Sequence, residues 1–205
     1  MYWIFRAVLK IVYKLLFCFE VRGAENIPAE GEVIIAANHL SHLDPPLIGV
    51  CIKRRAVFMA KSSLFHVPVI GWFVRRLSIP VDRDTARPST IKEAVRQLKE
   101  GRVLVMFPEG TRSRDGDVGG GKRGVAMIAA LSHARVVPAL IEGTERALPA
   151  GAGFLRPTKV RVTFGRPIEY SGAETSKSFQ QRITGEIMDR IRELKQEPVM
   201  RNSNL

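Results

Sequence analysis

Short apolar runs alternate with amphipathic stretches along most of the 205-residue chain. Compact aliphatic runs are typical of buried strands, and apolar residues at intervals of three and four are typical of helices that cover a sheet. The last run alternates polar and apolar side chains, as a half-exposed strand does. We therefore expect strands at residues 33–37, 56–60, 77–81, 103–107, 136–141 and 159–164.

Four helices are predicted between and after these strands. Asp44 precedes two prolines and is placed to cap a helix that starts there. Residues 90–93, TIKE, form a capping box for a helix that ends before Gly101. Two more helices are expected at residues 124–134 and from Ser178 onward. Strands that alternate with helices favour an α/β fold, a single domain with a largely parallel or mixed central sheet flanked by helices.

The first nineteen residues are apolar and aromatic, with cations spaced through them. Arg6, Lys10 and Lys14 recur at intervals of four, which stacks three cations on one helical face. The uncharged stretches are shorter than the roughly 18 residues of a membrane-spanning helix, and cations inside the apolar part argue against a cleavable signal peptide. We expect an amphipathic helix on a membrane surface, with its cations toward lipid phosphates. A helix simply packed on the domain is the alternative.

These patterns divide the chain into a membrane-interface helix at residues 1–20, one domain at 21–197 and a flexible tail at 198–205. A composition of 45% hydrophobic and 25% charged residues fits a globular domain with a substantial core. Cys18 and Cys51 are too few for a disulfide framework or a four-cysteine metal site, so reduced thiols are expected.

The charge is unusual, because 32 Lys and Arg face 20 Asp and Glu and leave a formal net charge of +12. Anionic partners are therefore expected, such as nucleic acid, an anionic membrane or a phosphorylated substrate. The basic residues are not interleaved with aromatics, and no helix-turn-helix, RNA-recognition or zinc motif is present, so nucleic acid is not favoured. A basic anion-binding module without catalysis remains an alternative.

Three polar clusters follow predicted strands, where the working residues of parallel sheets gather. They are residues 38–44 (NHLSHLD), 81–84 (VDRD) and 107–113 (FPEGTRS). In the first, His39 and Asp44 lie five positions apart, and an imidazole held by a carboxylate takes a proton from a hydroxyl near neutral pH. A cap, a surface charge cluster or a turn explains each cluster singly, but three in this order are not expected by chance. They predict an enzyme that acts on an alcohol.

The clusters resemble the sequence blocks of the glycerolipid acyltransferases, a family typified by 1-acylglycerol-3-phosphate acyltransferase. Residues 38–44 are similar to the first block with its His-x4-Asp signature, 79–83 to the second, 107–113 to the third and 137–140 to the fourth. One departure concerns residues 121–124, GKRG, which lack the aromatic of the Phe-Lys-x-Gly stretch frequent in the family.

The resemblance implies acyl transfer from a thioester, acyl-CoA or acyl carrier protein, to the sn-2 hydroxyl of lysophosphatidic acid, which gives phosphatidic acid. His39 would be the general base and Asp44 would orient it. The thioester is already activated, so no serine or cysteine nucleophile is needed. A same-fold enzyme with another acceptor, glycerol-3-phosphate or another lysolipid, and an inactive scaffold at the membrane are the alternatives.

The substrate-binding residues that the resemblance implies are Arg83, Glu109, Gly110, Thr111, Arg112 and Lys61. Arg83 and Arg112 suit the acceptor phosphate, because guanidinium groups bind its oxygens in a forked geometry. Glu109 would orient the arginines or an acceptor hydroxyl.

No cofactor is implied, and no metal, since the histidines show no ligand spacing with acidic or thiol partners. His42 is too close to Asp44 in sequence to pair with it and is excluded from the mechanism. The expected location is the cytoplasmic face of the membrane, as a peripheral or monotopic protein.

Overall fold

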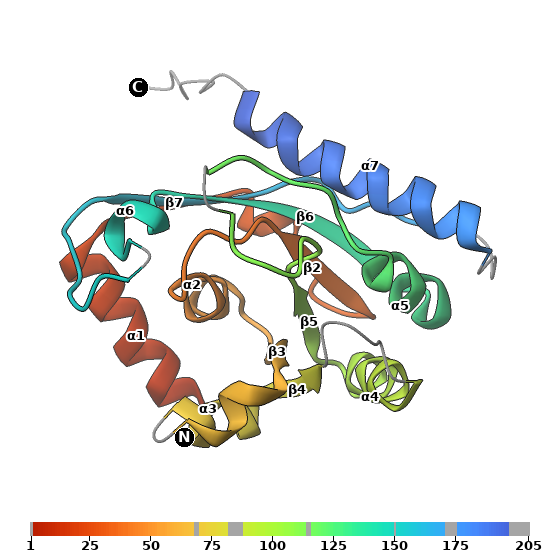
Figure 1. The fold of residues 1–205 in the computed structure, drawn as a ribbon, viewed down its shortest axis with the longest axis horizontal. Coiled ribbons are helices and arrows are strands. Elements are labelled where there is room, and N and C mark those ends of the chain that lie inside the picture. Colours follow the sequence, from red (N-terminus) through yellow and green to blue (C-terminus); the bar gives the residue numbers. More distant parts are fainter. Residues whose placement is uncertain are drawn as a thin grey trace.

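A mixed central sheet with helices on both faces organises the molecule (Figure 1). The computed structural model describes residues 2–67, 70–81, 88–113, 116–149, 151–170 and 176–196. Within these ranges the strands are β1 (Cys18–Arg22), β2 (Val33–Ala37), β3 (Ala56–Lys61), β4 (Ser78–Val81), β5 (Val103–Met106), β6 (Arg135–Glu142) and β7 (Lys159–Phe164). Their order across the seven-stranded sheet is β1-β7-β6-β2-β5-β3-β4. Strands β2 to β6 run parallel, β7 is antiparallel to β6, and β1 is parallel to β7.

The helices cover the sheet in two layers. In the described ranges they are α1 (Tyr2–Leu16), α2 (Asp44–Cys51), α3 (Ile70–Leu77), α4 (Pro88–Lys99), α5 (Gly124–Ser132), α6 (Thr144–Ala147) and α7 (Lys177–Gln196), with short 3-10 helices at Ala24–Asn26 and Ser62–His66. The predicted fold class, one α/β domain with a mostly parallel mixed sheet, is confirmed. All six predicted strands are present.

Strand β2 shows why its sequence is apolar without alternation. Ile34 and Ala36 pack into the layer that contains α4, α5 and α7, whereas Val33, Ile35 and Ala37 pack into the layer that contains α2 and the end of α1. All five side chains are fully buried. A strand covered on both faces needs apolar residues at every position.

Strand β1 and helix α3 were not predicted from the sequence. The five residues of β1 follow α1 after a single residue, Phe17, and pair with β7. Their strand conformation comes from this long-range pairing rather than from a clear local pattern. The boundary predicted after residue 20 falls inside β1, and the predicted tail at 198–205 lies outside the described residues.

The predicted capping box at Thr90 is wrong. Helix α4 begins two residues earlier, at Pro88, which suits the first turn because it has no N–H to leave unpaired. The Glu93 carboxylate accepts hydrogen bonds from Arg96 and Gln97 instead of capping the backbone.

Helix α1 is amphipathic and packs on the domain along one side. Tyr13 is buried against the α2 layer. The opposite side exposes a row of apolar side chains, Ile4, Val8, Ile11 and Leu15, and Trp3 is also exposed. No described helix is long and apolar enough to cross a bilayer.

Candidate active site

The loop between β2 and α2 brings an imidazole and a carboxylate together. His39 Nδ1 lies 2.8 Å from Asp44 Oδ2. The Asp44 side chain is 0% exposed and that of His39 is 13% exposed. Nothing in the described part of the chain hydrogen-bonds His39 Nε2. When Nδ1 carries the proton that faces Asp44, Nε2 is therefore available as a proton acceptor.

Further donors hold the Asp44 carboxylate in place. The backbone N–H groups of Leu40 and Ser41 donate to Oδ2 at 2.6 and 2.7 Å. The Thr144 hydroxyl donates to Oδ1 at 2.6 Å, and Thr144 is itself fully buried. A buried carboxylate needs such partners, since desolvation without them is costly. Asp44 is therefore fixed on both oxygens.

The prediction that Asp44 caps the following helix is wrong. The residue at the cap position is Leu43, and it makes no side-chain cap bond. Pro45 and Pro46 have no N–H, and the Leu47 N–H donates to the Leu43 carbonyl at 3.0 Å. No amide of the first turn is left for the carboxylate, which faces back toward the His39 loop.

Two residues that support the dyad were not singled out in the sequence. The Asn38 amide donates to the Ile141 carbonyl at 2.9 Å and accepts from the Ile141 N–H at 2.7 Å, which ties the end of β2 to β6. Thr144 begins α6 just after β6 ends. The position of Asn38 directly after a buried strand could have identified it from the sequence. Thr144 lies 100 residues from Asp44, and no sequence pattern links the two residues.

The third sequence cluster lies against the first. The Phe107 and His39 rings are stacked, with centroids 4.2 Å apart and planes at 25°. The Ser113 N–H donates to the His39 carbonyl at 2.7 Å. Because β2 and β5 are parallel neighbours, the segments that follow them meet at one edge of the sheet.

The glycine-rich stretch after residue 115 folds back onto this cluster. Gly110 has a left-handed φ of 72°, and a Cβ there would lie 2.9 Å from Lys122 Cε. Gly119 faces the Glu109 carboxylate, since a Cβ there would lie 3.8 Å from Oε2. The Lys122 N–H also donates to the Pro108 carbonyl at 2.8 Å. Lys122 thus adds a cation beside the third cluster, although this stretch departs from the family pattern.

His42 lies at the rim of the dyad, close to Arg112. Burial lowers the pKa of His42, and the nearby positive charge of Arg112 and the neighbouring His39 lower it further. The Asp44 carboxylate bonds His39 and not His42. Arg112 is exposed, so its charge faces solvent near the dyad.

The remaining predicted residues are less closely joined to the dyad. Lys61 is the last residue of β3 and pairs in register with Val81 at the end of β4, so it lies at the same edge of the sheet. Lys61 and Thr111 are exposed, and no described hydrogen bond or ion pair links either to His39. Arg83 lies outside the described residues. The described residues hold no group of three or more His, Cys, Asp or Glu side chains suited to a metal ion.

Helix α1 contacts the loop between β2 and α2 directly. The Tyr13 hydroxyl donates to the Leu43 carbonyl at 2.9 Å, one residue before Asp44. Burial, with a contribution from the charge of Asp44, raises the pKa of Tyr13 and keeps it a neutral donor. The Arg6 guanidinium donates to the Val50 carbonyl of α2 at 3.2 Å.

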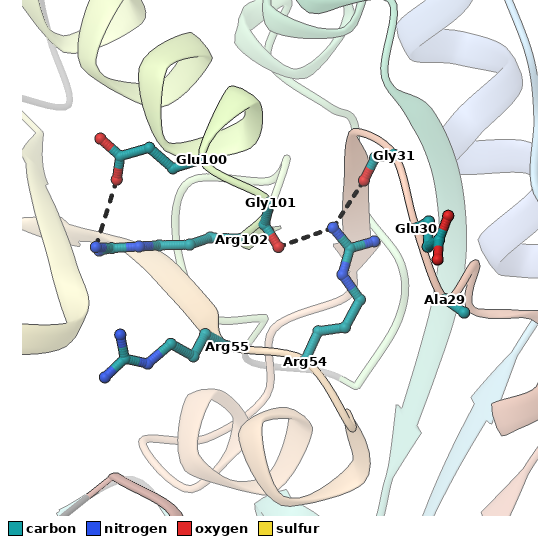
Figure 2. A pocket seen from close by; sticks show the side chains of 8 residues that line it. All are labelled: Ala29, Glu30, Gly31, Arg54, Arg55, Glu100, Gly101 and Arg102. Atoms are coloured by element: carbon teal, nitrogen blue, oxygen red, sulfur yellow. Dashed lines mark hydrogen bonds and ion pairs between the residues drawn. The ribbon is translucent and has the colours of Figure 1, made fainter.

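A separate pocket opens at the opposite edge of the sheet (Figure 2). Its lining comes from the segments that precede β2, β3 and β5: Ala29, Glu30, Gly31, Arg54, Arg55, Glu100, Gly101 and Arg102. The Arg54 guanidinium donates to the carbonyls of Pro28, Gly31 and Gly101 at 3.2, 2.7 and 2.8 Å. Since the strands start here and the dyad follows their ends, this pocket is not part of the candidate active site.

Comparison with known proteins identifies a family. Residues 18–142 match a family model described as Acyltransferase. A 1-acyl-sn-glycerol-3-phosphate acyltransferase of Bacillus subtilis is 33% identical over 190 residues, which cover 91% of this chain and 92% of that protein. A chloroplast 1-acyl-sn-glycerol-3-phosphate acyltransferase of Arabidopsis thaliana is 32% identical over 174 residues, 82% of this chain but only 49% of that protein. The chain thus spans about half the length of this plant relative.

A solved structure extends the similarity to the fold. The crystal structure of the 1-acyl-sn-glycerophosphate (LPA) acyltransferase of Thermotoga maritima matches with a TM-score of 0.72 and 34% identity, covering 88% of this chain and 73% of that one. The region matched by the family model contains the dyad and the whole third cluster. The chain therefore belongs to the acyltransferase family.

Proposed function

We propose that this protein is a 1-acyl-sn-glycerol-3-phosphate acyltransferase. It transfers a fatty acyl group from a thioester to the sn-2 hydroxyl of lysophosphatidic acid and forms phosphatidic acid. The observation that carries the proposal is the His39–Asp44 pair with an available Nε2, in a family member whose relatives bear this name.

In the proposed reaction His39 is the general base. Its Nε2 accepts the hydroxyl proton as the acceptor oxygen attacks the thioester carbonyl, while Nδ1–H donates to Asp44. The new carbon–oxygen bond forms and the carbon–sulfur bond breaks. The imidazolium then returns its proton to the departing thiolate. Asp44 stabilises the transient positive charge and fixes the tautomer.

The acyl group moves directly, without an acyl-enzyme. The Ser41 hydroxyl donates to the Leu148 carbonyl at 3.3 Å, which fits a role in shaping the loop. Burial raises the pKa of the Cys51 thiol to about 12, so it is a poor nucleophile near neutral pH.

A set of cations at the carboxyl edge of the sheet is proposed to bind the acceptor phosphate. Arg112 is near enough to the dyad for its charge to lower the pKa of His42, which supports a phosphate site there. Arg83 and Lys61 complete the cationic set, and Glu109, Gly110 and Thr111 shape it. The donor is acyl-CoA or acyl carrier protein, and the net charge of +12 suits the anionic character of both.

We place the enzyme on the cytoplasmic face of a membrane, held there by α1. The exposed apolar row on α1 and its cations support this placement, because such helices lie in the interface plane. The lysolipid acceptor is itself found at that surface.

The test is transfer by the purified full chain with acyl-CoA and with acyl carrier protein. Lysophosphatidic acid, glycerol-3-phosphate and a lysolipid without a bare phosphate serve as acceptors, and products are measured by mass spectrometry together with thiol release. We expect phosphatidic acid as the main product. Faster acylation of glycerol-3-phosphate would identify the alternative acceptor, and no thiol release with any acceptor would reject acyl transfer.

A further inference from the structure

Three exposed aromatic side chains each carry an arginine over the ring. They lie on α1, on α3 and in residues 151–158 between α6 and β7. Trp3 is 48% exposed, Trp72 46% and Phe154 65%. The guanidinium carbons lie 5.6, 3.9 and 5.4 Å from the ring centroids in the pairs Trp3–Arg6, Trp72–Arg76 and Phe154–Arg156.

This pairing has the chemistry of an interfacial anchor. A large aromatic ring exposed to water is unfavourable, whereas at a bilayer it reaches the boundary between headgroups and acyl chains. In the pairs on α3 and before β7, the arginine keeps its charge at the level of the lipid phosphates, and the cation–π contact holds the two groups together. Arg6 lies over Trp3 but also donates to the Val50 carbonyl of α2. What these three pairs share is an aromatic ring that is at least 46% exposed, with its arginine over it.

The segment that carries Phe154 ends beside the C-terminal end of α1. In the view of Figure 1, α3 is drawn near the N-terminal end of α1 and the segment before β7 near its C-terminal end. The Cys18 N–H, directly after α1, donates to the Thr158 carbonyl at 3.2 Å. An exposed apolar residue lies near each of the other two anchors in sequence: Val67 before α3, which carries Trp72, and Leu155 next to Phe154.

We infer that this protein binds an anionic lipid bilayer through three anchors, with α3 and the 151–158 segment entering the interface alongside α1. The inference rests on the proposed membrane association and deepens it, since it assigns two further contact sites. We assign lipid rather than protein as the partner of this surface. Each of the three aromatic rings is accompanied by an arginine, and the whole chain carries a net charge of +12.

The two tryptophans of the chain make a direct test available. Trp3→Phe leaves Trp72 as the only tryptophan, and Trp72→Phe leaves Trp3. Phe154→Trp in the double phenylalanine background reports the third anchor. Each variant is mixed with vesicles of equal parts phosphatidylcholine and phosphatidylglycerol, with or without brominated acyl chains. We expect a blue shift and quenching by the brominated lipid in all three variants, with unchanged circular dichroism.

The results of these experiments distinguish the three-anchor surface from contact through α1 alone, from self-association and from a lack of membrane binding. Quenching of Trp3 without quenching of Trp72 and of the residue 154 probe would overturn the three-anchor surface and leave α1 as the only contact. A blue shift of Trp72 that depends on protein concentration without vesicles would overturn it in favour of a second copy of the chain. If no variant sediments with vesicles, membrane association fails as well. Acylation of detergent-dispersed lysophosphatidic acid tests the proposed reaction independently.

A matched pair of arginine variants tests the charge component. Arg76→Gln should weaken vesicle binding about fivefold, as expected for one cation at an anionic surface. Arg182→Gln is the control, because Arg182 also lies over an aromatic ring, at 5.3 Å, but that ring belongs to the buried Phe179 of α7. Equal effects of the two substitutions would contradict the assignment of Trp72 and Arg76 as an anchor.

Discussion

The two edges of the central sheet each hold a charged side chain bound to backbone groups, but only at the carboxyl edge does that side chain also hold an imidazole. At the amino edge, the terminal nitrogens of Arg54 donate to three carbonyls and join three loops. At the carboxyl edge, Asp44 is bound as firmly, but it also positions His39, whose Nε2 remains available. The difference lies in the partner. Asp44 holds a ring with an available proton acceptor, whereas the hydrogen bonds of Arg54 in the described part of the chain go to backbone carbonyls, which suits a role in stability.

The largest effect is expected for His39→Ala. It removes the proposed base, so the rate of acyl transfer should fall by about 10²–10⁴-fold. Thiol release from acyl-CoA in the presence of lysophosphatidic acid measures it. His42→Ala is the matched control in the same loop and should retain most of the activity. Thiol release that persists unchanged in His39→Ala would remove that residue from the mechanism.

Arg112→Ala should impair use of the acceptor far more than use of the donor. Loss of a charge-assisted contact to phosphate costs about 1.5–3 kcal/mol, which corresponds to about 10–150-fold in apparent acceptor affinity. Titrations of each substrate at saturating levels of the other give the two KM values. Equal damage to both would count against a phosphate role. In the same variant the pKa of His42 should rise, measured by NMR, because Arg112 lowers it in the native protein.

Thr144→Val tests whether the buried support of the dyad matters. Valine keeps the shape but leaves Asp44 Oδ1 without its hydroxyl donor, so the free energy of unfolding should fall by about 1.5–3 kcal/mol. Since the hydrogen bond positions the carboxylate rather than a substrate, kcat should fall while both KM values stay constant. Thr144→Ser should restore both quantities, and failure to do so would point to packing instead of the hydrogen bond.

Arg54→Met should give the smallest loss of stability and should leave the rate of acyl transfer unchanged. It removes the donors to three carbonyls that water reaches in part, so the unfolding free energy should fall by about 1–2 kcal/mol. Urea denaturation measures this loss, and kcat and both KM values should match the native enzyme. A drop in kcat at a temperature where the variant is folded would break the contrast between the two edges.

The parts of the molecule that the sequence predicted are those with a local cause. Strand β2 is apolar at every position because both faces are covered, and β7 alternates because one face is. Strand β1 escaped prediction since its backbone bonds are made with β7, about 140 residues later. The sequence pattern around α1 indicated a helix, and nothing in it showed where the strand that pairs with β7 begins.

The same division holds at the site. The spacing of His39 and Asp44 placed them in one loop, so their pairing was predictable. The support from Thr144 depends on β6 lying beside β2 in a register that opposes Ala37 and Ala139. No pattern within either segment encodes that register. The capping role predicted for Asp44 failed because proline removes the amides that a cap would need.

The short junction between α1 and β1 restricts the angle between that helix and the central sheet. Only Phe17 separates the two elements, and it is buried, so the helix has no hinge about which to swing. With α1 flat on a lipid surface, as we propose, the plane of that surface also determines the tilt of the whole sheet. Lysolipids that diffuse in the leaflet would then approach the His39 loop from a single direction.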